Sequence, residues 1–111
     1  DDAMMLDYRG FIAEATGANI FFLKNKEIFT PIPDCFLNGI TRQTVIKLAI
    51  KLGIKVNQQY LKPSFIKGCD EAFLTGTAVE ITPIKSIDNY VFKSREISKK
   101  LIQEFKKKTT K

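Results

Sequence analysis

The stretch GITRQTVIKLAIKLG, residues 39–53, carries the clearest secondary-structure pattern in the chain. Four apolar side chains in it recur with the spacing i, i+3, i+4 and i+7: Val45, Leu48, Ala49 and Leu52. This spacing places them on one face of an α-helix. Gly53 is the residue type that most often follows the end of a helix. The stretch therefore predicts a helix that begins at Gly39-Ile40-Thr41, packs one face on a core and ends before Gly53.

Short apolar runs separated by turns precede this helix. Four runs have the composition and alternation of β-strands: Ala3–Leu6, Phe11–Ala13, Asn19–Lys24 and Glu27–Thr30. The turns between them predict two antiparallel hairpins. Pro31 and Pro33 lack the N–H group that a central strand must donate, so a loop is predicted from there to Gly39.

The region after Gly53 predicts further strands and two more helices. The strands are expected at Ile54–Leu61, Glu71–Thr75 and Val79–Ile84, with a short proline-opened helix at 62–66. A terminal helix is expected from about Arg95 to Lys107, and four residues mark its apolar face: Ile97, Leu101, Ile102 and Phe105. This mixed order predicts an α/β domain, with a curled mixed sheet and helices outside it.

Length and composition set the class of protein. The 111 residues, 44% of them hydrophobic, suffice for one small domain or a piece of one. The sequence shows no secretory signal and no apolar run near the ~20 residues that cross a bilayer, so a soluble cytoplasmic protein without membrane contact is expected. Cys35 and Cys69 are far apart and the chain has no histidine, which argues against a metal site and favours two reduced thiols.

The net charge of +6 raises the possibility of nucleic-acid binding. Residues 1–92, however, contain ten basic and ten acidic side chains, so the excess lies entirely in residues 93–111. That segment has the pattern of a solvated helix face and a frayed tail. We therefore expect no nucleic-acid partner, although a basic binding module using the terminal helix is kept as an alternative.

Three short segments could carry chemistry. Gly39-Ile40-Thr41 precedes the predicted helix, whose N-terminal N–H groups and dipole can bind a phosphate. Gly76-Thr77-Ala78 is a tight turn of small residues between two predicted strands, and Glu14 is a carboxylate at the end of an apolar run. Taken singly, each has a plainer explanation: a helix cap, a hairpin turn and a surface glutamate.

In combination these segments resemble one family. Glu14 to Phe21, Gly39 to Arg42 and Phe73 to Pro83 occur in the order and spacing of the fold-type-IV pyridoxal-phosphate enzymes. Within that family the chain looks most like the branched-chain amino-acid aminotransferases, because Val79-Glu80 follows Gly76-Thr77-Ala78. D-amino-acid transaminases and aminodeoxychorismate lyases are the alternative relatives. The resemblance covers nearly the whole chain and implies a mixed sheet curled into a partial barrel with outer helices.

The resemblance also implies the site residues. Glu14 matches the glutamate that pairs with the pyridine nitrogen of pyridoxal 5'-phosphate. Ile40 and Thr41, after Gly39, match the phosphate-binding helix start, and Leu37 matches an aliphatic residue on the cofactor ring. Thr77 matches a second phosphate ligand, and the amides of Thr77 and Ala78 match the turn that receives the substrate carboxylate.

Other family features have no match in these 111 residues. The family's catalytic lysine and its small domain lie upstream of positions corresponding to Asp1, so no catalytic residue is assigned here. Lysines within the body of the chain, such as Lys24, are expected to face solvent. Residues 1–111 are therefore expected to form the C-terminal portion of the large domain of such an enzyme.

The resemblance implies the activity of the complete enzyme. It would transfer the amino group of leucine, isoleucine or valine to 2-oxoglutarate, as a homo-oligomer. The isolated chain is expected to be inactive, because it lacks the catalytic lysine. A non-catalytic remnant with a structural or pairing role is the other alternative.

Two positions depart from the family pattern. Asn89 and Ser94 occupy places where the family usually has glycine. Asparagine tolerates a left-handed turn, so Asn89 is a mild change. Ser94 predicts a relaxed loop before the terminal helix.

Overall fold

A mixed five-stranded sheet forms the centre of the molecule. The computed structural model describes residues 4–6, 10, 12–15, 19–32, 40–75, 81–87 and 90–109. The sheet has the order β5-β4-β3-β6-β7. Its strands are β3 (Asn19–Lys24), β4 (Glu27–Pro31), β5 (Val56–Gln59), β6 (Glu71–Thr75) and β7 (Ile81–Pro83). Strands β4 and β5 are parallel and the other neighbours are antiparallel, so the predicted mixed α/β sheet is confirmed.

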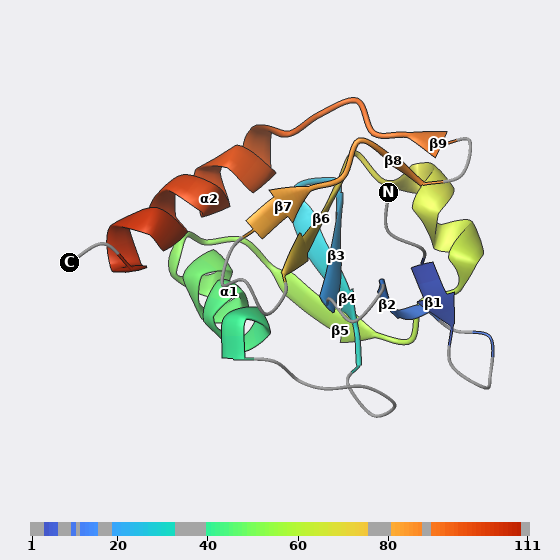
Figure 1. Cartoon of the computed structure of the whole chain (residues 1–111), viewed down its shortest axis with the longest axis horizontal. Coiled ribbons are helices and arrows are strands. Elements are labelled where there is room, and N and C mark those ends of the chain that lie inside the picture. Colours follow the sequence, from blue (N-terminus) through green and yellow to red (C-terminus); the bar gives the residue numbers. More distant parts are fainter. Residues whose placement is uncertain are drawn as a thin grey trace.

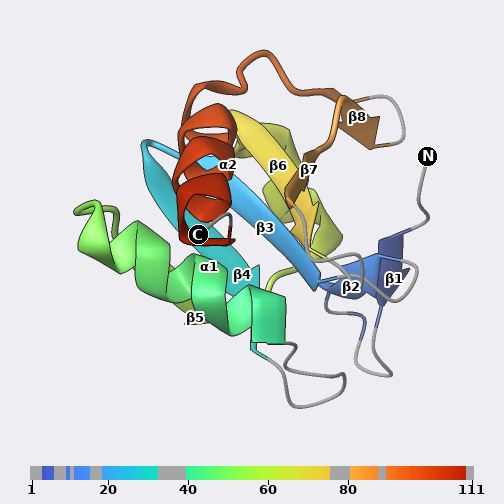
Figure 2. The ribbon, with the colours of Figure 1, turned by 60° about the vertical axis from the view of Figure 1, so that its left-hand side comes forward.

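The two α-helices cover one face of this sheet (Figures 1 and 2). They are α1 (Ile40–Lys51) and α2 (Glu96–Thr109). Val45, Leu48 and Ala49 of α1 pack with Leu101 and Phe105 of α2 on a set of strand residues: Phe21, Leu23, Ile28, Phe73 and Ile81. The helical stripes read from the sequence are thus the buried faces. Phe21 and Phe73 stack across β3 and β6 with ring centroids 4.8 Å apart.

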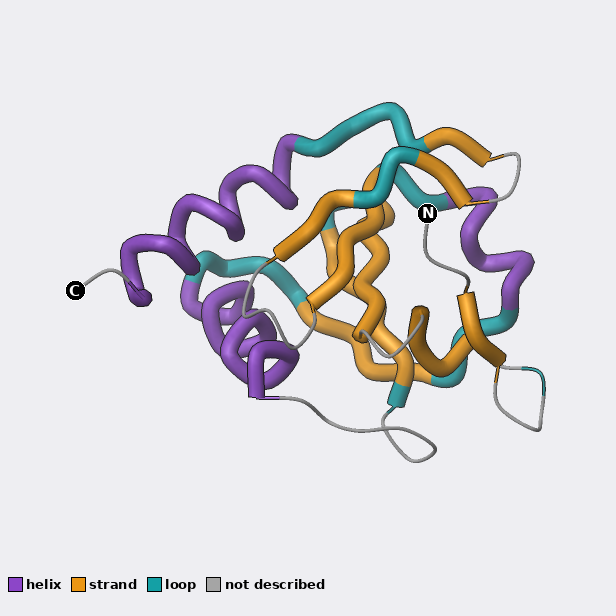
Figure 3. The backbone as a smooth tube through the Cα atoms, in the orientation of Figure 1, coloured by secondary structure: helices purple, strands orange, loops and turns teal. Residues whose placement is uncertain are grey.

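Shorter elements cover the other face of the sheet, as the tube in Figure 3 shows. They are β1 (Met4–Leu6), β2 (Ile12–Ala15), the 3-10 helix η1 (Pro63–Gly68), β8 (Ser86–Ile87) and β9 (Tyr90–Val91). The core on this side joins Ile20, Phe22 and Leu74 of the sheet to Ile66 of η1 and to Phe92. The molecule therefore has a helical layer, a sheet and a layer of small elements.

Local sequence explains the turns. The β3–β4 hairpin turns at Asn25 and Lys26, whose φ angles of 53° and 63° are those of a tight turn that matches strand twist. Gly53 has φ 82° and ends α1 as its sequence predicts. The short β8–β9 hairpin has no counterpart in the sequence-based prediction. No helix in the described part of the chain is long and apolar enough to cross a membrane.

Candidate functional site

The beginning of α1 is the first part of the candidate site. The helix starts at Ile40, so Ile40 and Thr41 occupy the helix N-terminus that the sequence predicts. Backbone N–H groups in the first turn of a helix have no partner within the helix, and the helix dipole is positive there. The first turn of α1 contains no acidic residue, and Thr41 is half-buried. This end of α1 is therefore suited to an anion.

Arg42, the third residue of α1, ties this helix start to the sheet. Its Nη2 donates to the carbonyl oxygen of Pro31 at 2.9 Å and to Oε1 of Gln58 at 3.0 Å. Pro31 is the last residue of β4, and Gln58 lies on the neighbouring β5. Arg42 is 2% exposed, and burial lowers the pKa of its guanidinium from the usual 12.5. Arginine stays charged at neutral pH all the same.

The three sequence segments all connect to one end of the sheet. Asn19, the first residue of β3, pairs with Thr75, the last residue of β6, and Thr75 pairs with Ile81, the first residue of β7. Because β4 is antiparallel to β3, its end at Pro31 lies at this same end. The chain enters β3 from the Glu14 segment and leaves β6 into Gly76-Thr77-Ala78, and the Arg42 side chain of α1 reaches the carbonyl oxygen of Pro31.

Thr75 places an unusual polar atom at this end of the sheet. Its Oγ1 is buried, and it has no hydrogen-bond partner in the described part of the structure. The nearby Thr30 hydroxyl, by contrast, donates to the carbonyl oxygen of Ile20 at 2.8 Å. Buried polar groups are nearly always hydrogen-bonded, so this hydroxyl at the last residue of β6 is available to a ligand, a water or a group outside the described ranges. The sequence interpretation assigned no role to Thr75, although a hydroxyl directly before Gly76-Thr77 was a usable signal.

Only some of the residues assigned from the sequence lie in the described part of the structure. For Glu14 it gives the backbone, which pairs with Met5 in the β1–β2 hairpin. It gives the backbone of Ile40, and both the backbone and the side chain of Thr41. The other assigned residues lie outside the described ranges: Leu37, Gly39, Thr77 and Ala78. Their roles, and the predicted convergence of Glu14 on the α1 start, stay predictions.

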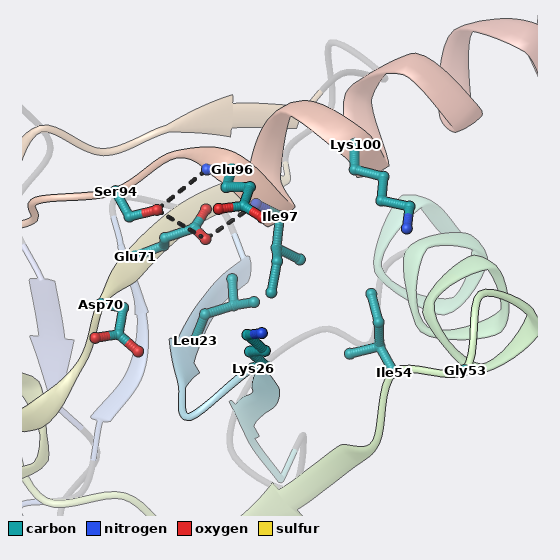
Figure 4. Close-up of a pocket in the computed structure, with 10 residues that line it drawn as sticks. All are labelled: Leu23, Lys26, Gly53, Ile54, Asp70, Glu71, Ser94, Glu96, Ile97 and Lys100. Atoms are coloured by element: carbon teal, nitrogen blue, oxygen red, sulfur yellow. Dashed lines mark hydrogen bonds between the residues drawn. The ribbon is translucent and has the colours of Figure 1, made fainter.

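A cavity of about 480 Å³ lies at the opposite end of the sheet. Figure 4 shows it between the β3–β4 turn, the end of α1 and the start of α2. Leu23, Ile54 and Ile97 form its apolar wall, and Lys26 and Lys100 extend toward it. None of the residues assigned from the sequence lines this cavity, so it is separate from the candidate site.

Glu71 beside this cavity holds α2 in place. It is 3% exposed, and its carboxylate accepts hydrogen bonds from the backbone N–H groups of Ile97 at 3.0 Å and Ser98 at 2.9 Å. It also accepts bonds from the hydroxyls of Ser98 and Ser94. The carboxylate therefore caps the positive end of α2. Glu71 therefore serves to stabilise the start of α2.

Two sequence interpretations need correction here. The sequence predicts a relaxed loop at Ser94, but its Oγ accepts from the Glu96 N–H at 3.3 Å and its own N–H donates to Asp70. The Glu71 carboxylate fixes this loop by accepting a hydrogen bond from Ser94. The two residues are 23 positions apart in sequence, so no local pattern reveals the contact. The sequence also predicts a solvent-facing Lys24, but this lysine is half-buried, with Nζ 5.2 Å from the centroid of the Phe65 ring.

Metal ligands do not gather anywhere in the described residues: no group of three or more His, Cys, Asp and Glu side chains is placed to hold an ion. The candidate site is instead made of backbone N–H groups and hydroxyls. These are donors, and an anion with several acceptor oxygens suits them.

Comparison with known proteins identifies the family. The family model described as amino-transferase class IV matches residues 1–87 of the chain. The chain belongs to this family. A probable branched-chain-amino-acid aminotransferase of Rickettsia felis is 48% identical over 109 residues, covering 95% of the chain and 38% of that protein. The branched-chain-amino-acid aminotransferase of Pseudomonas aeruginosa is 47% identical over 88 residues, covering 79% and 29% respectively.

Solved structures of branched-chain aminotransferases have the same fold. The enzyme of Thermoproteus uzoniensis, solved with norvaline, superimposes with a TM-score of 0.90 at 38% identity, covering 96% of the chain and 36% of the solved chain. The Escherichia coli enzyme gives a TM-score of 0.88 at 39% identity, with 94% and 37% covered. The chain thus spans a little over a third of the length of these solved relatives.

Proposed function

We propose that residues 1–111 form the C-terminal, cofactor-binding portion of the large domain of a branched-chain amino-acid aminotransferase. The observation that supports this proposal is the start of α1 at Ile40 and Thr41, because the Arg42 side chain ties this helix to Pro31, at the end of the sheet from which the chain continues into Gly76-Thr77-Ala78. One solved branched-chain aminotransferase, 33% identical with 95% of the chain covered, contains pyridoxamine 5'-phosphate, which supports a cofactor of this class.

The donor set fits the phosphate of pyridoxal 5'-phosphate. Ile40 and Thr41 would hold the phosphate with backbone N–H groups and the threonine hydroxyl, and Thr77 would add a second hydroxyl. The orphaned hydroxyl of Thr75 and the absence of acidic residues in the first turn of α1 agree with an anion there. The buried positive charge of Arg42 raises the potential on the same side.

The other residues would serve the cofactor ring and the substrate. Glu14 would keep the pyridine nitrogen protonated, and Leu37 would pack on one face of the ring. The amides of Thr77 and Ala78 would orient the carboxylate of leucine, isoleucine, valine or 2-oxoglutarate. Bound pyridoxal phosphate supplies the electron sink for transamination. The upstream part of the enzyme would supply the catalytic lysine, and the complete enzyme would be a cytoplasmic homo-oligomer.

Transaminase assays test this function. The chain alone should not transfer amino groups from leucine, isoleucine or valine to 2-oxoglutarate, because no residue in it takes the role of the catalytic lysine. Mixing with the upstream polypeptide of a close relative should give activity, and Glu14→Ala in the mixture should lower the turnover number about a hundredfold or more through loss of the electron sink. Unchanged activity of the mixed Glu14→Ala protein would contradict the assignment. So would turnover by the chain alone after removal of host enzyme.

A further inference from the structure

We propose that Arg42 is a positioning residue for the phosphate site: it holds the first turn of α1 against the ends of β4 and β5, so that the N–H groups there keep a fixed direction. This rests on the proposed function, because the site it positions is the anion site at the α1 start. Arg42 would not itself touch the ligand. Its effect would act through the helix.

The hydrogen bonds of Arg42 connect three elements at one point. A single nitrogen, Nη2, donates to both Pro31 and Gln58, at 2.9 and 3.0 Å. The carbonyl of Pro31 is at the end of β4, where the chain leaves the sheet on its way to α1. Fixing the third helical residue to this carbonyl sets where the helix axis meets the sheet. The backbone N–H groups of Ile40 and Thr41 lie along that axis, so the same contact sets their direction.

Helix stability does not account for an arginine at this position. A positive charge in the first turn opposes the helix dipole, and the lysines of α1 lie later, at Lys47 and Lys51. Burying a guanidinium to 2% exposure adds a desolvation cost that an apolar residue would avoid. A fixed and electropositive first turn that can bind an anion would explain why the dipole cost and the desolvation cost are both tolerated.

A guanidinium also holds the helix to two strands better than an ammonium would. The two N–H bonds of Nη2 point in fixed directions within the guanidinium plane, which matches two acceptors on adjacent strands. A lysine ammonium is a flexible, strongly hydrated point charge. Arg42→Lys should therefore keep the charge while loosening the contact, and Arg42→Met should lose both.

Titration of the whole 111-residue chain with pyridoxamine 5'-phosphate, followed by ¹H–¹⁵N NMR, tests this proposal. This probe has no aldehyde and cannot react with the lysines. In the unsubstituted chain the amide signals of Ile40 and Thr41 should shift, and phosphate-free pyridoxamine should not shift them. Arg42→Met should raise the dissociation constant about tenfold and Arg42→Lys about threefold. Lys47→Met, which removes a charge from the same helix, should stay within about twofold of the unsubstituted chain.

The outcomes separate the two proposals. In the absence of ligand, Arg42→Met and Arg42→Lys should already move the Thr41 amide signal, while Lys47→Met leaves it in place. If the unsubstituted chain binds the probe at Thr41 and Arg42→Lys binds equally well, the positioning role is overturned and the proposed function stands, even if Arg42→Met fails to fold. If the unsubstituted chain shows no response at Thr41, the proposed function fails, and the positioning role fails with it.

Discussion

At the scale of single residues, Thr75 and Thr30 offer a matched comparison. Both hydroxyls are buried near the end of the sheet where α1 begins, but that of Thr30 donates to Ile20 while that of Thr75 has no partner in the described structure. Without an anion, Thr75→Val should raise the free energy of unfolding by about 1 kcal/mol or leave it unchanged, because it removes an unsatisfied polar group. Thr30→Val should lower it by about 1 kcal/mol, because it leaves the Ile20 carbonyl without its hydroxyl donor.

Urea unfolding with and without phosphate measures both effects. Phosphate should stabilise the unsubstituted chain more than the Thr75→Val protein if the hydroxyl serves the anion site, since a ligand bound to the folded state adds to stability. A Thr75→Val protein that is destabilised as much as Thr30→Val in the absence of phosphate would show that the Thr75 hydroxyl already has a partner.

Cys69 should be unreactive in the folded chain. It is a free, buried thiol whose Sγ donates to the carbonyl oxygen of Phe65 at 3.3 Å. Burial raises its pKa to about 12, while Lys24 opposes this change and Asp70 adds to it. The thiolate is the reactive form, so at about pH 8 iodoacetamide should label Cys69 at least about a hundredfold more slowly than in the urea-unfolded chain.

Peptide mapping by mass spectrometry distinguishes Cys69 from Cys35 in this experiment.

The raised pKa of Cys69 also makes the stability of the chain depend on pH. Below about pH 9 the thiol is protonated in both states, whereas between about pH 9 and 12 the unfolded state alone releases its proton, so the contribution of Cys69 to stability falls as the pH rises through that window. Labelling of Cys69 in the native chain at the rate of the unfolded chain would contradict its described burial.

At the scale of secondary-structure elements, Glu71 fixes the packing of α2. Its carboxylate accepts the N–H groups of Ile97 and Ser98 and two serine hydroxyls. Glu71→Gln keeps the size but removes the charge and one acceptor oxygen, so the free energy of unfolding should fall by about 2–3 kcal/mol. Glu104→Gln, which affects an exposed pair with Lys107 on the same helix, should change it by less than about 0.5 kcal/mol. Denaturant unfolding decides between them, and equal losses would show that Glu71 is no special anchor.

The elements also show what local patterns can and cannot predict. The stripe of Val45, Leu48, Ala49 and Leu52 predicted α1 and its buried face, because helical periodicity is a local property. The hairpin turn at Asn25 was also predicted from the sequence, because turn preference is likewise a local property. The cap on α2 was not predicted, because it depends on contacts such as Ser94 with Glu71, which the fold brings together from distant parts of the sequence. The β8–β9 hairpin pairs only two residues on each strand, which is too short for an alternating pattern to be recognised.

At the scale of the whole molecule, the motifs predicted the family, and comparison with known proteins confirms it. Ile40 and Thr41 were placed at a helix start from the sequence, and the structure puts them there. The sequence did not predict that Arg42 is buried or that Thr75 has a buried hydroxyl without a described partner. A basic residue and a hydroxyl are expected at the surface until packing shows that they are buried.

We expect the isolated chain to self-associate. In the complete enzyme proposed above, upstream strands and the small domain would cover part of this domain, so the isolated chain should expose apolar surface. The described residues include three exposed large apolar side chains on different parts of the fold: Ile50 at 61%, Tyr60 at 45% and Val91 at 55%. Light scattering over a range of concentrations should show a mass above that of the monomer. A strictly monomeric chain at high concentration would contradict this expectation.

We propose above that this domain binds the phosphate of a pyridoxal-type cofactor at the start of α1. Its most direct test is the NMR titration of the isotopically labelled chain with pyridoxamine 5'-phosphate. The amide signals of Ile40 and Thr41 should shift until the site is saturated; binding should be weaker in high salt, and the shifts should be absent with phosphate-free pyridoxamine. Shifts confined to the lysine-rich helix α2, with Ile40 and Thr41 unmoved, would contradict it.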